Sequence, residues 1–469
     1  MGKKQAIERY LVLFLPWGIA TLFQSDPVLS YFIAWLGTIL IFYLSLSGWV
    51  RPLPKDRPIA EQMMRPIFLV QIIFAGYMSF SSIFYFMNLF GYEDFQKVNN
   101  SFFLVDQQKL ELTALCQRYY ALGHAAFVTG ILAFMKYPVK QKYHVETEKL
   151  ANILFVTAFV TLPVSFLFLK IPGLAQFYFQ FSSLSFIAGT LALAFAIPLK
   201  KLVNTVFCVL LYMSNFYQAL TSGFKEPIII SVLVLGIFLY PNYKKLVTVI
   251  FVPVLLMLFI VLPTYIGVFR QNNWGGDVNA DDSYKLALDA TIESEKAGDN
   301  SNWGFLVYRL SEVDMFTEFV QSTPGYVDYY GLKLLKQSAI AIVPRLFWPS
   351  KPITEDLVME RVYDAGVIHR GSNVSAKPAF IVDGYLSGGI PGIFIALFLY
   401  GAIAQLISLK AEHLFGGYIL GTALIFSGLF QIFWRGLSFE FLINSVFWSY
   451  ISMLIIFRIL RYTKVLKEV

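Results

Sequence analysis

Apolar runs of about 20 residues alternate with short polar segments along most of the chain. A helix needs about 20 apolar residues to cross the hydrocarbon core, and a helix satisfies its own backbone hydrogen bonds there. The pattern therefore predicts an all-α polytopic membrane protein with about 12 transmembrane helices. The predicted spans cover approximately residues 10–23, 28–50, 67–90, 116–135, 151–169, 178–198, 202–220, 227–240, 246–268, 388–408, 416–434 and 440–458.

One long polar segment interrupts this alternation between spans nine and ten. We expect a single membrane domain, 1–469, in which residues 269–387 form a large extracytoplasmic loop containing short helices. Apolar residues at helical spacing predict one helix over Trp303–Val320 within the loop. The amphipathic stretch Leu332–Val343 predicts a second helix, which would lie at the membrane surface.

The distribution of positive charge predicts the orientation of the chain. With the amino terminus in the cytoplasm, the short connecting segments hold 20 Lys and Arg residues inside and 6 outside. Such an excess on the cytoplasmic side is typical of membrane proteins. We expect a multi-pass protein of the bacterial cytoplasmic (inner) membrane with both termini in the cytoplasm. No small-x-small site follows the first apolar stretch, so we expect it to remain as a span.

Composition excludes several classes of protein. Of the 469 residues, 57% are hydrophobic and only 14% are charged, and the mean hydropathy of +0.62 argues against a water-soluble enzyme. The net charge of +7 is dispersed around the spans, so we expect no nucleic-acid partner. Two cysteines and four scattered histidines give no metal-ligand spacing, and no nucleotide-binding glycine motif occurs. We therefore expect no metal and no cofactor.

Ionisable residues are scarce inside the predicted spans. His124 is the one deep candidate, and we expect it to be a buried histidine whose ring nitrogens are satisfied by hydrogen bonds, whereas Arg118 and Glu440 lie near outer ends. An ion-coupled transporter would ordinarily carry charged groups near the bilayer midplane. The polar residues gather instead at the outer ends of spans and in the long loop, which favours a reaction or a binding event at the outer boundary.

The segment Pro344–Pro352 is the strongest candidate for a pyrophosphate site. Its three prolines fix the backbone, so Arg345 and Lys351 would be presented at little ordering cost. Arginine binds phosphate oxygens in a bidentate manner, and lysine acts as a point charge. The supporting cations are Arg270, Arg309 and Lys225. Ordinary alternatives are an ion pair between Arg309 and Glu312, and a solvated loop charge for Arg361 next to Glu360.

Aromatic and acidic residues in the loop suit a sugar, whose C–H faces stack on rings. Tyr326, Tyr329 and Tyr330 are the candidate glycan-binding residues, although an aromatic belt at the headgroup level explains a single tyrosine equally well. His369 and Asp383 are rival candidates for a catalytic general base. For His369, an ordinary surface histidine is the alternative.

Three segments resemble the Wzy-type polysaccharide polymerases, also called O-antigen or oligosaccharide repeat-unit polymerases. They are VPRLFWPSKP (Val343–Pro352), DGYLSGGIPG (Asp383–Gly392) and, more weakly, TSGFKEP (Thr221–Pro227). The number of spans and the large late loop are also similar. The arginine-x10-glycine pattern of some members does not occur at Arg309, Arg345, Arg361 or Arg370, so no arginine is assigned from it.

The resemblance implies a metal-independent membrane glycosyltransferase that works outside the cytoplasmic membrane. It would transfer a growing O-antigen, capsule or exopolysaccharide glycan from undecaprenyl pyrophosphate to a new lipid-linked repeat unit. The implied partners are undecaprenyl-pyrophosphate-linked oligosaccharide and membrane lipid, together with a chain-length regulator and a flippase. A lipid-linked glycan ligase, a flippase or transporter of lipid-linked sugars, and a non-catalytic assembly subunit are the alternatives.

Overall fold

The computed structural model describes residues 7–57, 62–98, 103–223, 225–273, 279–297, 302–308, 310, 312–372, 375–431 and 437–469. About 74% of the residues are helical, which confirms the all-α class. Two short antiparallel strand pairs, β1 with β2 and β3 with β4, are the sheet structure of the described residues.

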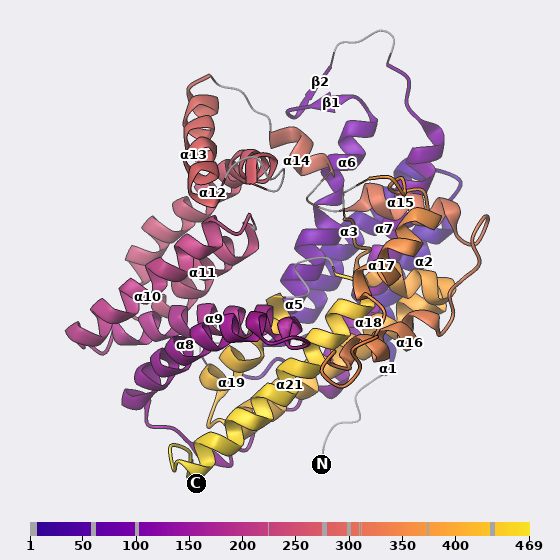
Figure 1. Cartoon of the computed structure of the whole chain (residues 1–469). Coiled ribbons are helices and arrows are strands. Elements are labelled where there is room, and N and C mark those ends of the chain that lie inside the picture. The colour runs from indigo at the N-terminus through magenta and orange to yellow at the C-terminus, as the bar shows by residue number, and fades with distance from the viewer. Residues whose placement is uncertain are drawn as a thin grey trace.

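The elements follow one another as a series of helices with short connections (Figure 1). The amino-terminal elements are α1 (Ile7–Leu11), η1 (Val12–Phe14), α2 (Leu15–Leu22), α3 (Pro27–Leu46), α5 (Pro66–Gln71), η2 (Ile72–Phe80), α6 (Ser82–Leu89), β1 (Tyr92–Glu93), β2 (Gln96–Lys97) and α7 (Gln107–Phe134). The central elements are β3 (Tyr143–His144), α8 (Thr147–Lys170), η3 (Ala175–Phe177), α9 (Tyr178–Ala196), α10 (Leu202–Leu220), α11 (Lys225–Leu239) and α12 (Lys244–Asn273). The carboxy-terminal elements are α13 (Ala280–Ala297), α14 (Asn302–Tyr308), α15 (Val313–Ser322), α16 (Lys333–Ile342), α17 (Thr354–Asp364), α18 (Phe380–Leu414), α19 (Tyr418–Ile425), η4 (Phe426–Gln431), α21 (Phe439–Tyr462) and β4 (Lys467–Glu468).

Every predicted span coincides with helical structure, but fewer helices are suited to crossing a membrane alone. In the described residues, six helical segments are long and apolar enough to span, and α12, which bends by 41°, raises the number to seven. The six are Pro27–Leu46, Pro66–Leu89, Lys149–Lys170, Ala175–Ala196, Phe380–Leu414 and Phe439–Tyr462. The others are short, as α2 and α11 are, or carry polar side chains, as α7 does.

Helices α7 and α18 form a close crossing in the interior of the molecule. A Cβ atom added at Gly130 would lie 2.2 Å from the Phe398 carbonyl oxygen, and one added at Gly401 would lie 2.2 Å from that of Phe127. Glycine at both positions therefore lets the two backbones approach, as small residues do between membrane helices. This contact fixes α18, which carries the candidate site, against the buried helix α7.

Helix α18 is broken near its start, within the segment Asp383–Gly392. The backbone leaves helical geometry at Gly388 and Gly389, and Gly389 has a φ of 63°, a conformation that favours glycine. Pro391 then lies at the beginning of the second part, where proline is tolerated because its missing N–H would have no helical partner. The break separates a short helix, 380–387, from the long apolar helix that follows.

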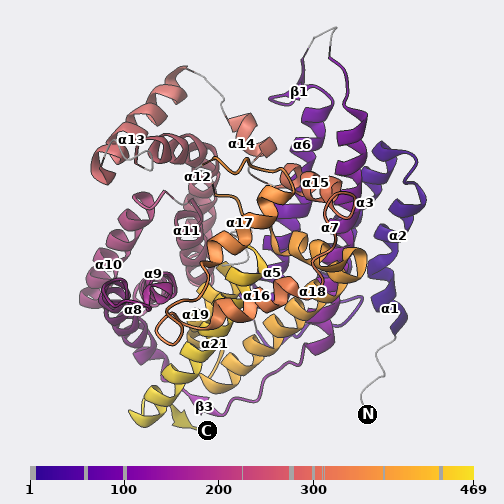
Figure 2. The same cartoon turned by 45° about the vertical axis from the view of Figure 1, so that its right-hand side comes forward.

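The long segment before α18 folds into five helices, α13 to α17. Helices α16 and α17 pack against α21, whereas α15 lies beside α7 in both views (Figures 1 and 2). The prediction of one helix over Trp303–Val320 is wrong, because the chain forms α14 and α15 separately and Glu312 adopts a left-handed conformation between them. The predicted amphipathic helix is confirmed as α16.

Candidate functional site

A buried ion cluster joins three helices beside the break in α18. Arg361 on α17 contacts Asp383 on α18, with Nε 2.9 Å from Oδ1 and Nη2 2.9 Å from Oδ2. The same guanidinium donates to Glu440 on α21, Nη1 to Oε1 at 2.9 Å and Nη2 to Oε2 at 2.7 Å. The Phe439 backbone N–H also donates to Asp383 Oδ2, at 2.7 Å. The cluster thus ties a loop helix to two candidate spans.

The interpretation of Arg361 as a solvated loop charge is wrong. Its side chain is 1% exposed, and both carboxylates are fully buried. Burial alone would lower the pKa of Arg361, but Asp383 and Glu440 outweigh it and raise that pKa above its usual range. Asp383, predicted as a general base, therefore lies in an ion pair without solvent contact.

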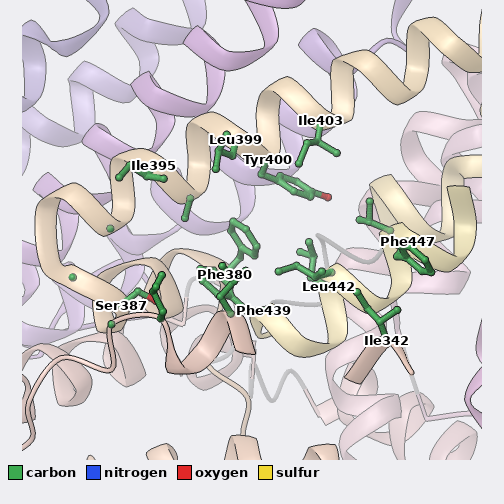
Figure 3. A pocket seen from close by; sticks show the side chains of 18 of the residues that line it. Ile342, Phe380, Ser387, Ile395, Leu399, Tyr400, Ile403, Phe439, Leu442 and Phe447 are labelled. Carbon is green, nitrogen blue, oxygen red and sulfur yellow. The ribbon is translucent and has the colours of Figure 1, made fainter. Parts of the chain in front are cut away.

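An apolar groove lies beside this cluster, between α16, α18 and α21 (Figure 3). Its volume is about 750 Å³. Figure 3 shows Ile395, Leu399 and Ile403 of α18 on one side and Leu442 and Phe447 of α21 on the other. Most lining side chains are aliphatic or aromatic, so the groove suits a hydrocarbon chain.

The end of the groove at the helix break carries polar groups. Gly331, Ser387 and Gly388 line it there. The Tyr330 N–H donates to the Leu386 carbonyl at 2.8 Å, which fixes the loop before α16 onto the short helix of α18. Tyr329 lies against the break, since a Cβ at Gly389 would be 2.9 Å from its hydroxyl.

Two of the three predicted glycan-binding tyrosines therefore lie at this break. Tyr329 is 40% exposed, and Tyr330 is half-buried with its hydroxyl donating to Asp364 Oδ2 at 3.3 Å. Burial raises the pKa of Tyr330, and the nearby carboxylate of Asp364 adds to that shift. Tyr326, 88% exposed, projects into solvent.

Sequence reasoning missed two charged groups at the same place. Lys333, the first residue of α16, lies with its ammonium 5.3 Å from the Tyr330 ring centroid. Asp364, the last residue of α17, accepts from Tyr330 and also from Arg370, at 3.2 Å. Lys333 follows Tyr330 by only three residues, so the sequence did carry a signal for it, whereas Asp364 meets Tyr330 only because α17 folds back beside the loop.

The predicted base His369 is exposed and lies beside Arg370. Arg370 donates to Glu360 as well as to Asp364, and these carboxylates raise the pKa of its guanidinium. Through Asp364, this turn adjoins Tyr330 and the helix break. Of the two predicted bases, His369 is thus the one that solvent reaches.

The structure places Lys351 inside the loop. Its ammonium donates to the carbonyl oxygens of Ala341 at 3.2 Å and Val343 at 2.7 Å, which satisfies acceptors at the carboxyl end of α16. Burial lowers the pKa of Lys351, and the neighbouring Arg345 lowers it further. The side chain of Lys351 therefore points inward and is not presented at the surface, contrary to the prediction.

Arg345 donates to two carbonyl oxygens of its own loop, those of Pro349 at 3.4 Å and Pro352 at 3.2 Å. It follows the carboxyl end of α16, whereas Tyr330 precedes the amino end. Ten residues separate the two ends of that helix by about 15 Å. The structure therefore does not bring Arg345 to the tyrosines at the break.

The remaining predicted cations lie elsewhere or outside the described residues. Arg270, near the end of α12, donates from Nε to the Gly223 carbonyl at 2.8 Å. Lys225 begins α11, but its side chain lies outside the described part, as does the whole of Arg309 and its proposed pair with Glu312. His124 is fully buried on α7 near the rings of Phe42 and Phe74, but neither ring nitrogen has a hydrogen-bond partner among the described residues, so the expectation of a satisfied histidine is wrong.

Within the described residues, no group of three or more His, Cys, Asp or Glu side chains is arranged to hold a metal ion. Residues 15–468 match the model of a family described as a domain of unknown function, DUF8712. The chain belongs to this family. No curated protein and no solved structure matches the chain.

Proposed function

We propose that this membrane protein is a polymerase of lipid-linked oligosaccharide repeat units. It transfers a growing glycan from undecaprenyl pyrophosphate to the terminal sugar of a new lipid-linked unit, on the outer side of the inner membrane. The observation that carries the proposal is the apolar groove between α18 and α21, which ends at a helix break beside Tyr329 and Tyr330.

The groove matches an amphiphilic substrate. A polyprenyl chain would lie along Ile395, Leu399 and Ile403, where burial of apolar surface supplies binding energy. Its headgroup would then emerge at Ser387 and Gly388. This arrangement supports a lipid-linked substrate over a free sugar, which would bury no hydrocarbon.

The groups at the break suit glycosyl transfer from a pyrophosphate. Tyr329 and Tyr330 offer ring faces to the sugar, and Lys333 offers a positive charge to the departing pyrophosphate, where charge develops in the transition state. His369 takes the proton of the acceptor hydroxyl. The Arg361–Asp383–Glu440 cluster positions α17 against α18 rather than contacting substrate, because its carboxylates are fully buried.

Filling the groove tests the proposal. Val446→Trp places a large ring in the groove wall, whereas Ile455→Trp changes an exposed residue two turns further along the same helix, outside the groove. Expressed in a deletion strain at equal protein levels, the first variant should yield short glycans and the control normal ones. Normal chain lengths from Val446→Trp would contradict the proposal.

A further inference from the structure

The loop helix α16 and the segments beside it expose large apolar side chains although they belong to the long polar segment of the chain. Large apolar side chains are 39–77% exposed at six positions of this segment. They are Leu332, Leu335, Leu346, Phe347, Trp348 and Ile353. Contiguous exposed apolar residues mark a contact with a partner or a membrane. We call α16 together with residues 343–353 the α16 strap.

The place of the α16 strap in the fold indicates that its partner is the membrane surface. A Cβ at Gly173 would lie 2.7 Å from the Leu346 backbone nitrogen, so the turn of the strap packs on the connection between α8 and α9. Both of those helices are apolar enough to span. The Trp448 indole also donates to the Ile342 carbonyl, at 2.9 Å, which fixes the strap to α21. The strap therefore lies where spans end.

The turn that carries the aromatic residues is held rigidly. The N–H groups of Phe347 and Trp348 both donate to the Pro344 carbonyl, at 3.0 and 3.2 Å. From inside, Lys351 bonds the carbonyls of Ala341 and Val343. Phe347, 77% exposed, is thus presented outward without further ordering. Tryptophan and phenylalanine presented in this way are typical of insertion at the headgroup level.

The charge of the strap selects the kind of lipid. Between Tyr329 and Pro352 the sequence contains four Lys or Arg residues and no Asp or Glu, and of the four cations only Lys351 is buried. Lys336 is exposed on α16, and Arg345 lies in the turn, where it donates to the carbonyl oxygens of Pro349 and Pro352. Aliphatic stems beside apolar neighbours let such cations reach headgroup phosphates from an inserted helix.

We propose that the α16 strap is a docking surface for anionic phospholipid headgroups, with Leu346, Phe347 and Trp348 inserted and Lys336 and Arg345 bound to phosphate. This assignment gives Arg345 a role apart from substrate pyrophosphate and stands independently of the proposed function. A strap seated on lipid would hold α16 at the mouth of the groove, which Leu335 and Ile342 line.

The experiment uses the full chain in nanodiscs of phosphatidylcholine, with or without phosphatidylglycerol. Hydrogen–deuterium exchange of residues 332–353 should be slower when phosphatidylglycerol is present, and native mass spectrometry should detect retained phosphatidylglycerol. Each Lys or Arg near an anionic membrane surface increases the binding affinity roughly fivefold. Lys336→Gln with Arg345→Gln should therefore lower retention by about 25-fold, and the control Lys285→Gln, on exposed α13, should not.

Phe347→Ser supplies a second test, because loss of the inserted ring should speed exchange of the strap in both compositions. Equal exchange and equal lipid retention in the wild type and the double variant would overturn the proposal. Protection by inorganic pyrophosphate in phosphatidylcholine nanodiscs, with no effect of phosphatidylglycerol, would also overturn it and would return Arg345 to substrate binding.

Discussion

Removing Arg361 should destabilise the protein more than any ordinary loop substitution. The side chain is 1% exposed and makes four contacts of 2.7–2.9 Å with Asp383 and Glu440. Arg361→Gln leaves two fully buried carboxylates without their cation. Loss of one partner from a buried ion pair lowers the free energy of unfolding by about 3–5 kcal/mol. Because Arg361→Gln leaves two carboxylates without a cation, we expect a loss of about 5 kcal/mol.

Chemical unfolding in detergent, followed by tryptophan fluorescence, measures the loss of stability. Exchange of 354–364 should rise at the same time, because α17 loses its attachment to α18 and α21. Neutralising the carboxylates in the triple variant Arg361→Gln, Asp383→Asn, Glu440→Gln should recover much of the stability, since the uncompensated charge is then gone. Arg370→Gln, which removes an exposed arginine of the same region, is the matched control and should cost less than about 1 kcal/mol. An Arg361→Gln variant as stable as this control would refute the reasoning.

Three further predictions concern the site, its metal dependence, and the ion pair of Asp56 with Arg65, which also lies 3.9 Å from Glu412 near the carboxyl end of α18. Lys333→Ala should lower polymer formation on the order of a hundredfold, and its effect should exceed that of Arg345→Ala. If glycan lengths show instead that Arg345→Ala has the larger effect, Arg345 and not Lys333 binds the pyrophosphate. Chelation by EDTA should leave polymerisation by the reconstituted protein unchanged, because the proposed transfer uses no metal. If EDTA stops polymerisation and an added divalent cation restores it, this prediction is wrong. Arg65 donates a hydrogen bond of 2.6 Å to Asp56, which lowers the pKa of that carboxyl group. The ionised Asp56 therefore stabilises the folded protein above the usual aspartate pKa of about 3.9. This stabilisation is lost as the pH falls through the lowered pKa of Asp56 in the folded protein. The unfolding midpoint should therefore fall on acidification below about pH 4, with a weaker dependence in Asp56→Asn.

Hydropathy located the helices well, because each apolar run must form a helix wherever it is buried from water. It predicted 12 spans, whereas six or seven helical segments of the described residues are long and apolar enough to cross alone, and α2 and α11 are among the short ones. Helix α13 was missed although its start is visible in the sequence. Asn279 caps it by accepting from the Asp282 N–H at 2.9 Å, and acidic residues occupy its first turn.

The cluster of Arg361, Asp383 and Glu440 could not be predicted from the sequence, for a physical reason. Arg361 pairs with residues 22 and 79 positions away, on two other helices, whereas reading along the chain shows only its neighbour Glu360. Lys351 illustrates a second limit. The flanking prolines predicted a rigid loop, but the direction of its ammonium depends on where the carboxyl end of α16 presents its carbonyl oxygens.

The measurement that tests the central claim most directly is the glycan profile of a strain that lacks this protein. Loss of a polymerase should leave lipid carriers and final products bearing single repeat units, and expression of the intact chain should restore long polymers. Full-length polymer that is made but not attached would indicate a ligase instead. Lipid-linked units that accumulate on the cytoplasmic side would indicate a flippase, and either result would contradict the account.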